Sequence, residues 1–309
     1  MSHAEYDLII VGGGPAGLTA GLYASRAMMK AVLVEKGAVG GQVLLTDWID
    51  NYPGFPEGIS GFELIDKMAA QAARFGLVTK LGSVVSMELR DPVKRLIMED
   101  GAELTAKTVI IATGARPKKL GVPGEAELTG KGVSYCATCD GPFYRNHEVA
   151  VVGGGNTAVE EAVYLTRFAD KVTVIHRRNE LRATKILQQH AFENDKVHFL
   201  LDTQVQSVVG NDGVEGLQLR NNNGEESFLP VHGVFMLIGT DPNNEMLPLN
   251  DLVPDPYGFI PTDGEMRTSI PGVMAVGDIR SKAVRQVVNA AGEGAVAVLA
   301  VEEYLRQPG

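Results

Sequence analysis

The sequence predicts an α/β protein made of two Rossmann-like dinucleotide-binding domains, one of them inserted into the other. Three observations lead to this prediction. A glycine-rich turn follows a strand-like segment near the N-terminus, and the same arrangement recurs near the middle of the chain. A short apolar segment and a long alanine-rich helix then follow the second copy. Strand–turn–helix–strand units of this kind build doubly wound folds, and 309 residues exceed what one ordinary core requires.

The first copy has the order strand, glycine turn, helix, strand. In its GxGxxG turn the first glycine permits the turn, the second lets a pyrophosphate approach, and the third lets helix and strand pack closely. The helix N-terminus presents free N–H groups to phosphates. Glu35 ends the second strand, 23 residues after Gly12, where an acid can bind ribose hydroxyls. The expected elements are strands at 6–11 and 31–35 and a helix at 15–28, with Gly12, Gly14 and Gly17 in the turn.

The second copy repeats this order with the opposite charge at the corresponding position. Counting 23 residues from Gly153 leads to His176, which begins a basic run instead of an acid. Guanidinium groups bind a 2′-phosphate bidentately, whereas an acid repels it. The second copy therefore predicts an NADPH site. Its elements are strands at 148–152 and 171–175 and a helix from the turn to about Phe168, with Gly153, Gly155 and Ala158 in the turn and Arg177, Arg178 and Arg182 in the basic segment.

Each half continues in the same way. A helix, at 61–75 in the first half and about 183–192 in the second, precedes alternating strands with turn signals. Ser60 and Glu63 form a capping box for the first of these helices. Both meanders close with an apolar strand that ends at glycine, at 108–114 and 233–239.

The C-terminal segment belongs with the first domain. A buried strand within 271–280 ends near Asp278, and a helix follows from about Arg285 to Leu305. This segment is too short to form a third domain. We therefore expect residues 1–115 and 246–309 to form one discontinuous domain and residues 116–245 to form the inserted one.

Composition excludes several classes of protein. Hydrophobic residues make up 45% and charged residues 21% of the chain, which are globular values. The net charge of -10 argues against nucleic-acid and anionic-membrane partners. No apolar run approaches the roughly 20 residues of a membrane span, and the N-terminal stretch does not resemble a signal peptide. A cytoplasmic location is the expectation.

The two cysteines of the chain lie three positions apart, in SYCATCDG. Two cysteines cannot complete a tetrahedral zinc site, and no histidine pair with ligand spacing lies nearby, so we expect no metal. A structural crosslink over so short a loop would remove little chain entropy. In a reducing cytosol a CxxC is more often catalytic or metal-binding than structural. A redox dithiol explains Cys136 and Cys139 best.

Taken together, these motifs resemble those of the low-molecular-weight, bacterial-type thioredoxin reductases, in the FAD/NADPH pyridine nucleotide-disulfide oxidoreductase family. The segments that carry the resemblance are GGGPAG, GGQ with NYPG, IATGA, CATCDG, GGGNTAVEEA, HRRNELRA and GVMAVGDIR with RQVVNAAGEG. They cover essentially the whole chain. Departures are Asn179 and Leu181, where the family often has an acid and an aromatic residue, and Pro142, in a loop that borders the protein substrate.

The resemblance implies an FAD domain split around an NADPH domain, and a homodimer. It implies FAD contacts from Gly12, Gly14, Gly17, Glu35, Gly41, Gln42, Thr46, Asn51, Ala112 and Thr113, with Asp278, Arg285 and Gln286 closing the site from the C-terminal helix. It implies NADPH contacts from Gly153, Gly155, Asn156, Thr157, His176, Arg177, Arg178 and Arg182.

The resemblance also implies a reaction. A hydride passes from NADPH to FAD, then electrons pass to the Cys136–Cys139 disulfide, and thiol–disulfide exchange delivers them to thioredoxin. Cys139 would face the flavin, Cys136 would attack the substrate disulfide, and Asp140 would be the acid/base. The alternatives are reduction of another small redoxin or dithiol substrate, or a non-catalytic dinucleotide-binding protein. Retention of Cys136, Cys139 and Asp140 speaks against the last of these.

Overall fold

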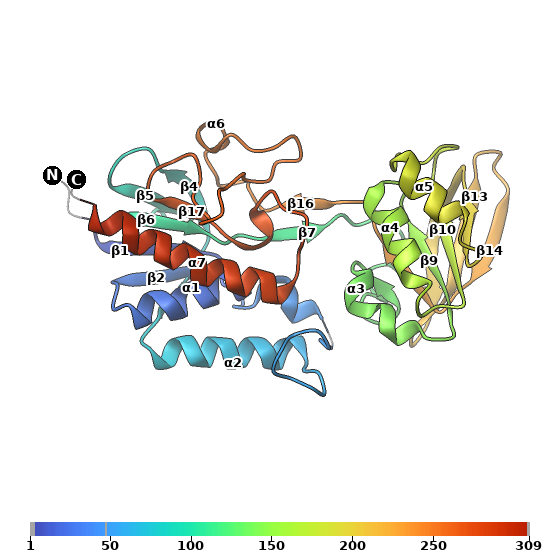
Figure 1. Cartoon of the computed structure of the whole chain (residues 1–309), viewed down its shortest axis with the longest axis horizontal. Helices are drawn as coiled ribbons and strands as arrows, with labels where there is room; N and C mark the ends of the chain where they lie inside the picture. Colours follow the sequence, from blue (N-terminus) through green and yellow to red (C-terminus); the bar gives the residue numbers. More distant parts are fainter. Residues whose placement is uncertain (1–3, 47, 308–309) are drawn as a thin grey trace. The chain divides into compact units, whose positions relative to one another are not determined.

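The computed structural model describes residues 4–46 and 48–307, which form two compact units. Unit 1 comprises Met1–Arg116 and Asp241–Gly309, and unit 2 comprises Pro117–Thr240. The two chain crossings between them, β7 (Ala115–Pro117) and β16 (Thr240–Pro242), pair as a two-stranded sheet (Figure 1). The fold is therefore α/β, with the second unit inserted into a sequence-discontinuous first unit, as predicted.

Unit 1 is a three-layer structure around one mixed sheet. In the described residues the sheet has the order β3-β2-β1-β6-β5-β4, and β17 pairs in parallel with β6. Because β17 returns to this sheet, the C-terminal segment lies in unit 1. The elements are β1 (Tyr6–Val11), α1 (Pro15–Arg26), β2 (Ala31–Glu35), η1 (Gly41–Leu45), α2 (Gly61–Arg74), β3 (Val78–Leu81), β4 (Val84–Glu88), β5 (Lys94–Met98), β6 (Glu103–Ile111), α6 (Leu249–Leu252), β17 (Val273–Ala275), η3 (Gly277–Ile279) and α7 (Val287–Arg306).

Unit 2 repeats this plan. Its parallel sheet has the order β11-β10-β9-β15-β8, and a separate antiparallel sheet has the order β12-β13-β14. The elements are β8 (Val133–Ser134), α3 (Ala137–Asp140), η2 (Gly141–Tyr144), β9 (Glu148–Val152), α4 (Asn156–Leu165), β10 (Lys171–Ile175), α5 (Lys185–Phe192), β11 (Val197–Leu200), β12 (Thr203–Gly210), β13 (Val214–Asn221), β14 (Glu226–Pro230) and β15 (Gly233–Met236).

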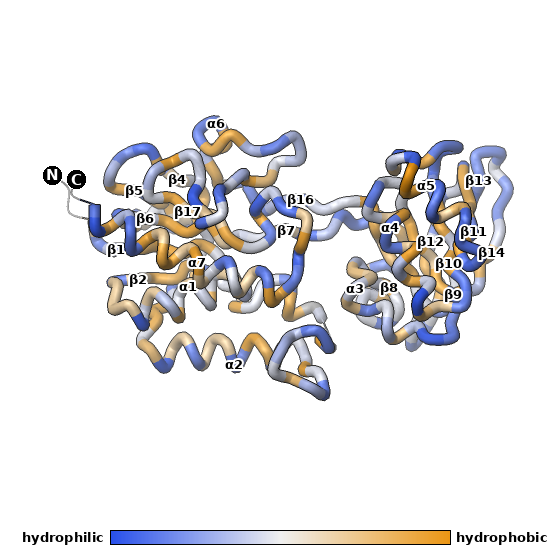
Figure 2. Tube along the Cα trace, viewed as in Figure 1, coloured by the Kyte–Doolittle hydropathy of each residue, from blue (hydrophilic) through white to orange (hydrophobic). Residues whose placement is uncertain are grey.

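Strand alternation builds two cores in each unit, because successive side chains of a strand point to opposite faces. On β1, Leu8 and Ile10 pack with the helices, whereas Ile9 and Val11 pack with the meander. On β9, Val149 and Val151 likewise face α4 and α5, while Ala150 and Val152 face β12 and β13. These strands are buried on both faces, which explains their continuous apolar sequences (Figure 2). The sheets thereby hold both glycine turns rigidly.

Several element ends differ from the sequence prediction. The strand expected at 108–114 begins earlier, at Glu103, because its first residues pair with β5. It ends at Ile111, and the strand expected at 233–239 ends at Met236. The helix expected to reach Phe168 ends at Leu165, and the one expected from about Ala183 begins at Lys185. The expected capping interaction is present, since the Ser60 hydroxyl accepts the N–H of Glu63.

The start of the C-terminal helix also differs. Helix α7 begins at Val287 with Gln286 in an extended conformation before it, so Arg285 and Gln286 precede the helix and are not part of it. Among the described residues, no helix is long and apolar enough to cross a membrane.

Candidate functional site

The first glycine turn is shaped by close backbone contacts. Gly12 has a φ of +109°, and a Cβ there would lie 2.3 Å from the Ala112 carbonyl oxygen. A Cβ on Gly17 would lie 1.9 Å from the Gly12 carbonyl oxygen, so helix α1 crosses the strand end at backbone distance. A Cβ on Gly14 would meet no atom within 4 Å. The first and third glycines are therefore required by packing, while the second borders open space at the N-terminus of α1.

The second turn has the same geometry. Gly153 has a φ of +152°, and a Cβ there would lie 2.4 Å from the Leu237 carbonyl oxygen. Gly155, the N-cap of α4, borders open space as Gly14 does. Ala158 takes the third position and is fully buried. The two turns thus present the same anion-accepting arrangement in two different units.

Glu35 and His176 each lie 23 residues after the first glycine of a turn. Their side chains lie against the glycine that directly follows it, Gly13 and Gly154. Glu35 accepts hydrogen bonds from the backbone N–H of Gly13 at 2.7 Å and of Gly37 at 3.0 Å. The ring of His176 would lie 2.5 Å from a Cβ on Gly154. The two side chains therefore occupy equivalent places, one an acid and the other an imidazole.

His176 contributes no positive charge. It is buried, and its pKa is lowered by burial and then by Arg182, Arg178 and Arg177. The positive charge of this segment comes from the three arginines, which are exposed. Within residues 4–46 and 48–307, none of their guanidinium groups forms an ion pair.

Backbone hydrogen bonds hold the basic segment against the glycine turn. The Gly154 carbonyl accepts from the N–H of Arg182 at 2.7 Å and of Ala183 at 3.0 Å. The Asn156 side chain accepts from Thr184 N–H at 2.9 Å. Thr157 is exposed in the first turn of α4. The residues predicted for one nucleotide therefore come together from two segments of unit 2.

The residues predicted for the other nucleotide gather around the first turn. A Cβ on Gly41 would lie 3.6 Å from the Gly14 Cα, and Ala112 underlies Gly12. The Asn51 amide donates to the Gln286 side chain at 3.2 Å, which joins two predicted residues far apart in sequence. Among residues 4–46 and 48–307, the side chains of Gln42 and Thr46 form no hydrogen bond.

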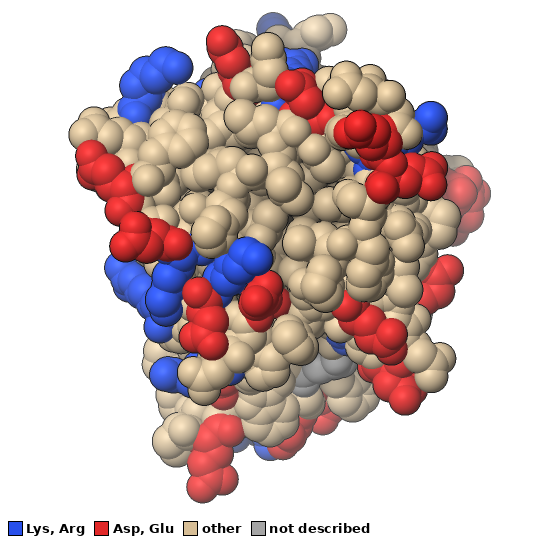
Figure 3. Space-filling model, turned by 90° about the vertical axis from the view of Figure 1, so that its right-hand side faces the viewer, with Lys and Arg blue, Asp and Glu red and all other residues tan. Residues whose placement is uncertain are grey.

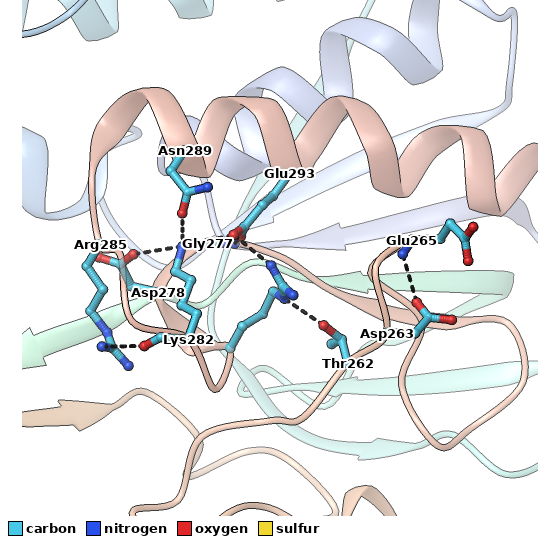
Figure 4. Close-up of polar contacts among 10 residues, drawn as sticks. Thr262, Asp263, Glu265, Gly277, Asp278, Lys282, Arg285, Asn289 and Glu293 are labelled. Carbon is cyan, nitrogen blue, oxygen red and sulfur yellow. Dashed lines mark hydrogen bonds and ion pairs between the residues drawn. The ribbon is translucent and has the colours of Figure 1, made fainter.

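A buried ionic cluster supports the turn that carries Asp278 (Figure 4). Glu293, which is 6% exposed, accepts the backbone N–H of Gly277 at 2.7 Å and pairs with Arg280 at 2.6 Å. Lys282 lies 3.2 Å from Glu293 and 3.3 Å from Asp278. Glu293, Arg280 and Lys282 were not predicted from the sequence. For Glu293 the sequence did contain a signal, because an acid in the middle of an alanine-rich apolar helix requires partners for its charge.

Four buried polar atoms test whether dinucleotides fit these places. Within the described chain, Thr113 Oγ1, Arg285 Nε and His176 Nε2 are buried without a hydrogen-bond partner, and Asp278 Oδ1 is buried with only the ion pair to Lys282 at 3.3 Å. Leaving such groups unpaired costs about 1–3 kcal/mol each. Burial also raises the pKa of Asp278, against the opposing effect of Lys282 and Arg285. All four belong to residues predicted to contact nucleotides, so the donor and acceptor set fits FAD in unit 1 and NADPH in unit 2.

The dithiol lies in a short helical turn of unit 2. Cys136 and Cys139 form a disulfide with their Cα atoms 5.3 Å apart. The Cys136 sulfur accepts the backbone N–H of Cys139 at 3.2 Å and lies 3.4 Å from the Thr138 hydroxyl. Ser134 Oγ accepts the Cys136 N–H at 3.1 Å. Both cysteines are half-buried, so the disulfide is within reach of solvent.

Asp140 ends this turn. Its N–H donates to the Cys136 carbonyl at 3.1 Å, and its charge contributes to the raised pKa of Tyr144. The predicted acid/base is therefore held next to the dithiol by the same turn that carries both cysteines.

Two glycine turns, one held by an acid and the other flanked by three exposed arginines, together with an accessible dithiol, define a dinucleotide-dependent disulfide oxidoreductase. The chain belongs to the family described as Pyridine nucleotide-disulphide oxidoreductase, which matches residues 6–294. This family affiliation makes the protein a flavoprotein oxidoreductase that uses FAD and NADPH.

Relatives match nearly the whole chain. A thioredoxin reductase of Peptoclostridium litorale is 47% identical over 309 residues, with 98% of each chain covered. The crystal structure of thioredoxin reductase from Streptococcus pyogenes is 49% identical, with a TM-score of 0.93 and coverage of 98% and 99%. The thioredoxin reductase from Giardia duodenalis is 33% identical, with a TM-score of 0.94 and coverage of 99% and 100%.

A half-buried tyrosine next to the dithiol turn gives a pH prediction. Burial raises the pKa of Tyr144 to about 12, whereas an unfolded chain releases this proton near pH 10. The folded state then binds the proton more tightly, so this stability is present below about pH 10 and is lost as the pH rises to about 12. We expect Tyr144→Phe to reduce the alkaline loss in urea unfolding free energy by about 1–2 kcal/mol. The exposed Tyr257→Phe is the control, and equal alkaline losses in all three proteins would contradict the prediction.

Proposed function

We propose that the protein is an NADPH-dependent thioredoxin-disulfide reductase. The observation that carries the proposal is the Cys136–Cys139 disulfide in the same unit as an arginine-flanked dinucleotide turn. The names of the full-length relatives support thioredoxin as the oxidised substrate. When bound, FAD would supply two-electron chemistry between the nicotinamide and the dithiol.

The residues of each unit suggest which dinucleotide it holds. Glu35 would accept ribose hydroxyls in unit 1, while Thr113, Asp278 and Arg285 would pair their buried polar atoms with FAD. The site would be completed by the remaining predicted residues Gly12, Gly14, Gly17, Gly41, Gln42, Thr46, Asn51, Ala112 and Gln286. In unit 2 the guanidinium groups would hold the 2′-phosphate of NADPH, with Gly153, Gly155, Asn156, Thr157 and His176 binding the rest of the nucleotide.

The dithiol geometry suggests a role for each of its residues. The hydrogen bonds from Cys139 N–H and the Thr138 hydroxyl to the Cys136 sulfur would stabilise a thiolate there. Cys136 is therefore the thiol expected to attack the substrate disulfide, which leaves Cys139 to reclose the bond. Asp140 would donate the proton that the leaving thiolate of the substrate takes up.

The test is NADPH oxidation by the purified holoenzyme in the presence of oxidised thioredoxin and a disulfide reporter. We expect turnover that depends on all three components and falls strongly when NADH replaces NADPH. A small dithiol substrate or another redoxin that supports turnover while thioredoxin does not would identify the alternative substrate class. A yellow protein that NADPH does not bleach would overturn the proposal.

The surface charge bears on the remaining partner predictions. On the face shown in Figure 3, acidic side chains lie around a broad neutral area, and basic side chains gather at one side of it. Nucleic-acid binding surfaces usually present a continuous basic patch. The expectations of no nucleic-acid partner, no membrane partner and a cytoplasmic location stay predictions.

We also propose a homodimer through the helical face of unit 1. A groove of about 340 Å³ lies among α1, α2 and α7, lined by apolar residues that include Leu18, Tyr23 and Val288. Large apolar side chains on the same helices are exposed, among them Phe62 at 70% and Leu299 at 61%. Exposed apolar patches of this kind commonly mark protein interfaces. A second copy of the chain would cover this face.

A charge placed in this groove tests the dimer. We expect Val288→Asp to shift the protein from dimer to monomer in sedimentation velocity, because burying an unpaired carboxylate at an interface costs several kcal/mol. Phe228→Asp is the matched control, since Phe228 is similarly exposed but lies in unit 2. A wild-type protein that sediments as a monomer would contradict the proposed interface.

A further inference from the structure

A carboxylate from helix α4 reaches the dithiol turn. Glu161 Oε2 accepts the backbone N–H of Ala137 at 3.1 Å. Ala137 follows Cys136 directly and begins the helical turn that carries the disulfide. The two residues are 24 positions apart, and helices α3 and α4 pack against each other. One acidic side chain thus fixes the backbone between the two cysteines.

Glu161 is half-buried where helix α4 meets the dithiol turn. Burial raises the pKa of Glu161, the Ala137 hydrogen bond opposes this shift, and the adjacent Glu160 adds to it. The other titratable groups of the dithiol turn and η2 are Asp140 and Tyr144. The remaining ones on α4 and on the elements packed against it are Tyr164, Lys185, His190, Glu148 and Lys171. Within the part of the chain that the structure describes, no lysine or arginine pairs with Glu161. Its charge is therefore not compensated by a neighbouring cation.

The electrostatic consequence appears when the disulfide is reduced. Two electrons enter and break the S–S bond, one sulfur takes up a proton, and the other remains a thiolate with a charge of -1. A carboxylate next to this turn disfavours that new negative charge more strongly than it affects the neutral disulfide. The reduced form then gives up its electrons more readily.

We propose that Glu161 is a positioning residue that fixes the Ala137 amide and, through its charge, makes the Cys136–Cys139 dithiol a stronger reductant. This inference rests on the proposed function, because only a redox-active dithiol has a potential to adjust. It extends that function by naming a residue that acts through the Ala137 backbone N–H.

The decisive variant is Glu161→Gln, whose amide oxygen still accepts the Ala137 N–H but carries no charge. We expect its dithiol to be about tenfold easier to reduce in a glutathione redox buffer, which corresponds to a potential about 30 mV less negative. The fraction of reduced cysteines is measured in the holoenzyme by alkylation and mass spectrometry, without NADPH or thioredoxin. The rate of alkylation of the reduced protein against pH should also show a thiolate that forms at lower pH.

Glu160→Gln is the matched control, because it removes the same charge from the exposed neighbouring position on the same helix. We expect it to change the equilibrium by less than about twofold. A Glu161→Gln protein that matches wild type would overturn the electrostatic role, and an equal shift in both variants would show that any nearby acid acts alike. If the wild-type cysteines do not exchange with glutathione at all, the proposed function fails instead.

Discussion

Replacing either cysteine by serine should abolish thioredoxin reduction while leaving NADPH-driven bleaching of the flavin intact. Cys136 and Cys139 are joined in one disulfide, so each is an essential member of a single relay. Hydride transfer precedes the dithiol and does not need it. We therefore expect a loss of thioredoxin turnover of at least about 1000-fold in Cys136→Ser and in Cys139→Ser, measured with a disulfide reporter.

The two variants should also differ from each other. The Cys136 sulfur accepts hydrogen bonds from the Cys139 N–H and lies near the Thr138 hydroxyl, so the thiol that remains in Cys139→Ser is the activated one. We expect Cys139→Ser to form a mixed disulfide with an aromatic disulfide reagent faster than Cys136→Ser does. Substantial thioredoxin turnover in either variant would refute the relay, and a faster reaction of Cys136→Ser would reverse the roles of the two sulfurs.

Removing Arg177 and Arg178 should change the choice of coenzyme. Both guanidinium groups are exposed and follow the buried His176 at the position equivalent to Glu35. Charge-assisted hydrogen bonds contribute roughly 1.5–3 kcal/mol each, so the KM for NADPH should rise on the order of tenfold to a hundredfold per arginine. The KM for NADH should stay nearly unchanged, because NADH has no 2′-phosphate. Steady-state oxidation of the two coenzymes by Arg177→Ala/Arg178→Ala protein measures this.

Arg220→Ala is the control for the coenzyme prediction. Arg220 is an exposed arginine of the same unit that lies on β13, outside the basic segment 176–182. Its loss should leave both KM values within about twofold of wild type. If the double variant weakened NADPH and NADH equally, the arginines would not be reading the 2′-phosphate. A lowered melting temperature would then indicate a folding defect.

The sequence by itself determined the features that local chemistry encodes. Glycines whose Cβ atoms would overlap backbone, as at Gly12, Gly17 and Gly153, can be predicted from spacing because nothing larger fits the turn. Alternating and continuous apolar segments predicted the strands, because the pattern of apolar residues reflects which faces of a strand are buried. The charges at Glu35 and Arg177 and the spacing of Cys136 and Cys139 are likewise properties of short segments.

Element ends and the groups that support the site were decided only by the tertiary structure. Strand β6 begins at Glu103 because β5 pairs with it, and α7 begins after Gln286, so neither end follows from its own residues. Glu161 and Glu293 resemble ordinary helix acids in the sequence, where the charge on each would be expected to face solvent. Packing buries Glu293 and half-buries Glu161, and a carboxylate withdrawn from water requires donors, which the Gly277 and Ala137 amides supply from distant segments. Long-range burial therefore decides which acids serve the site, and that information is absent from any single stretch of the chain.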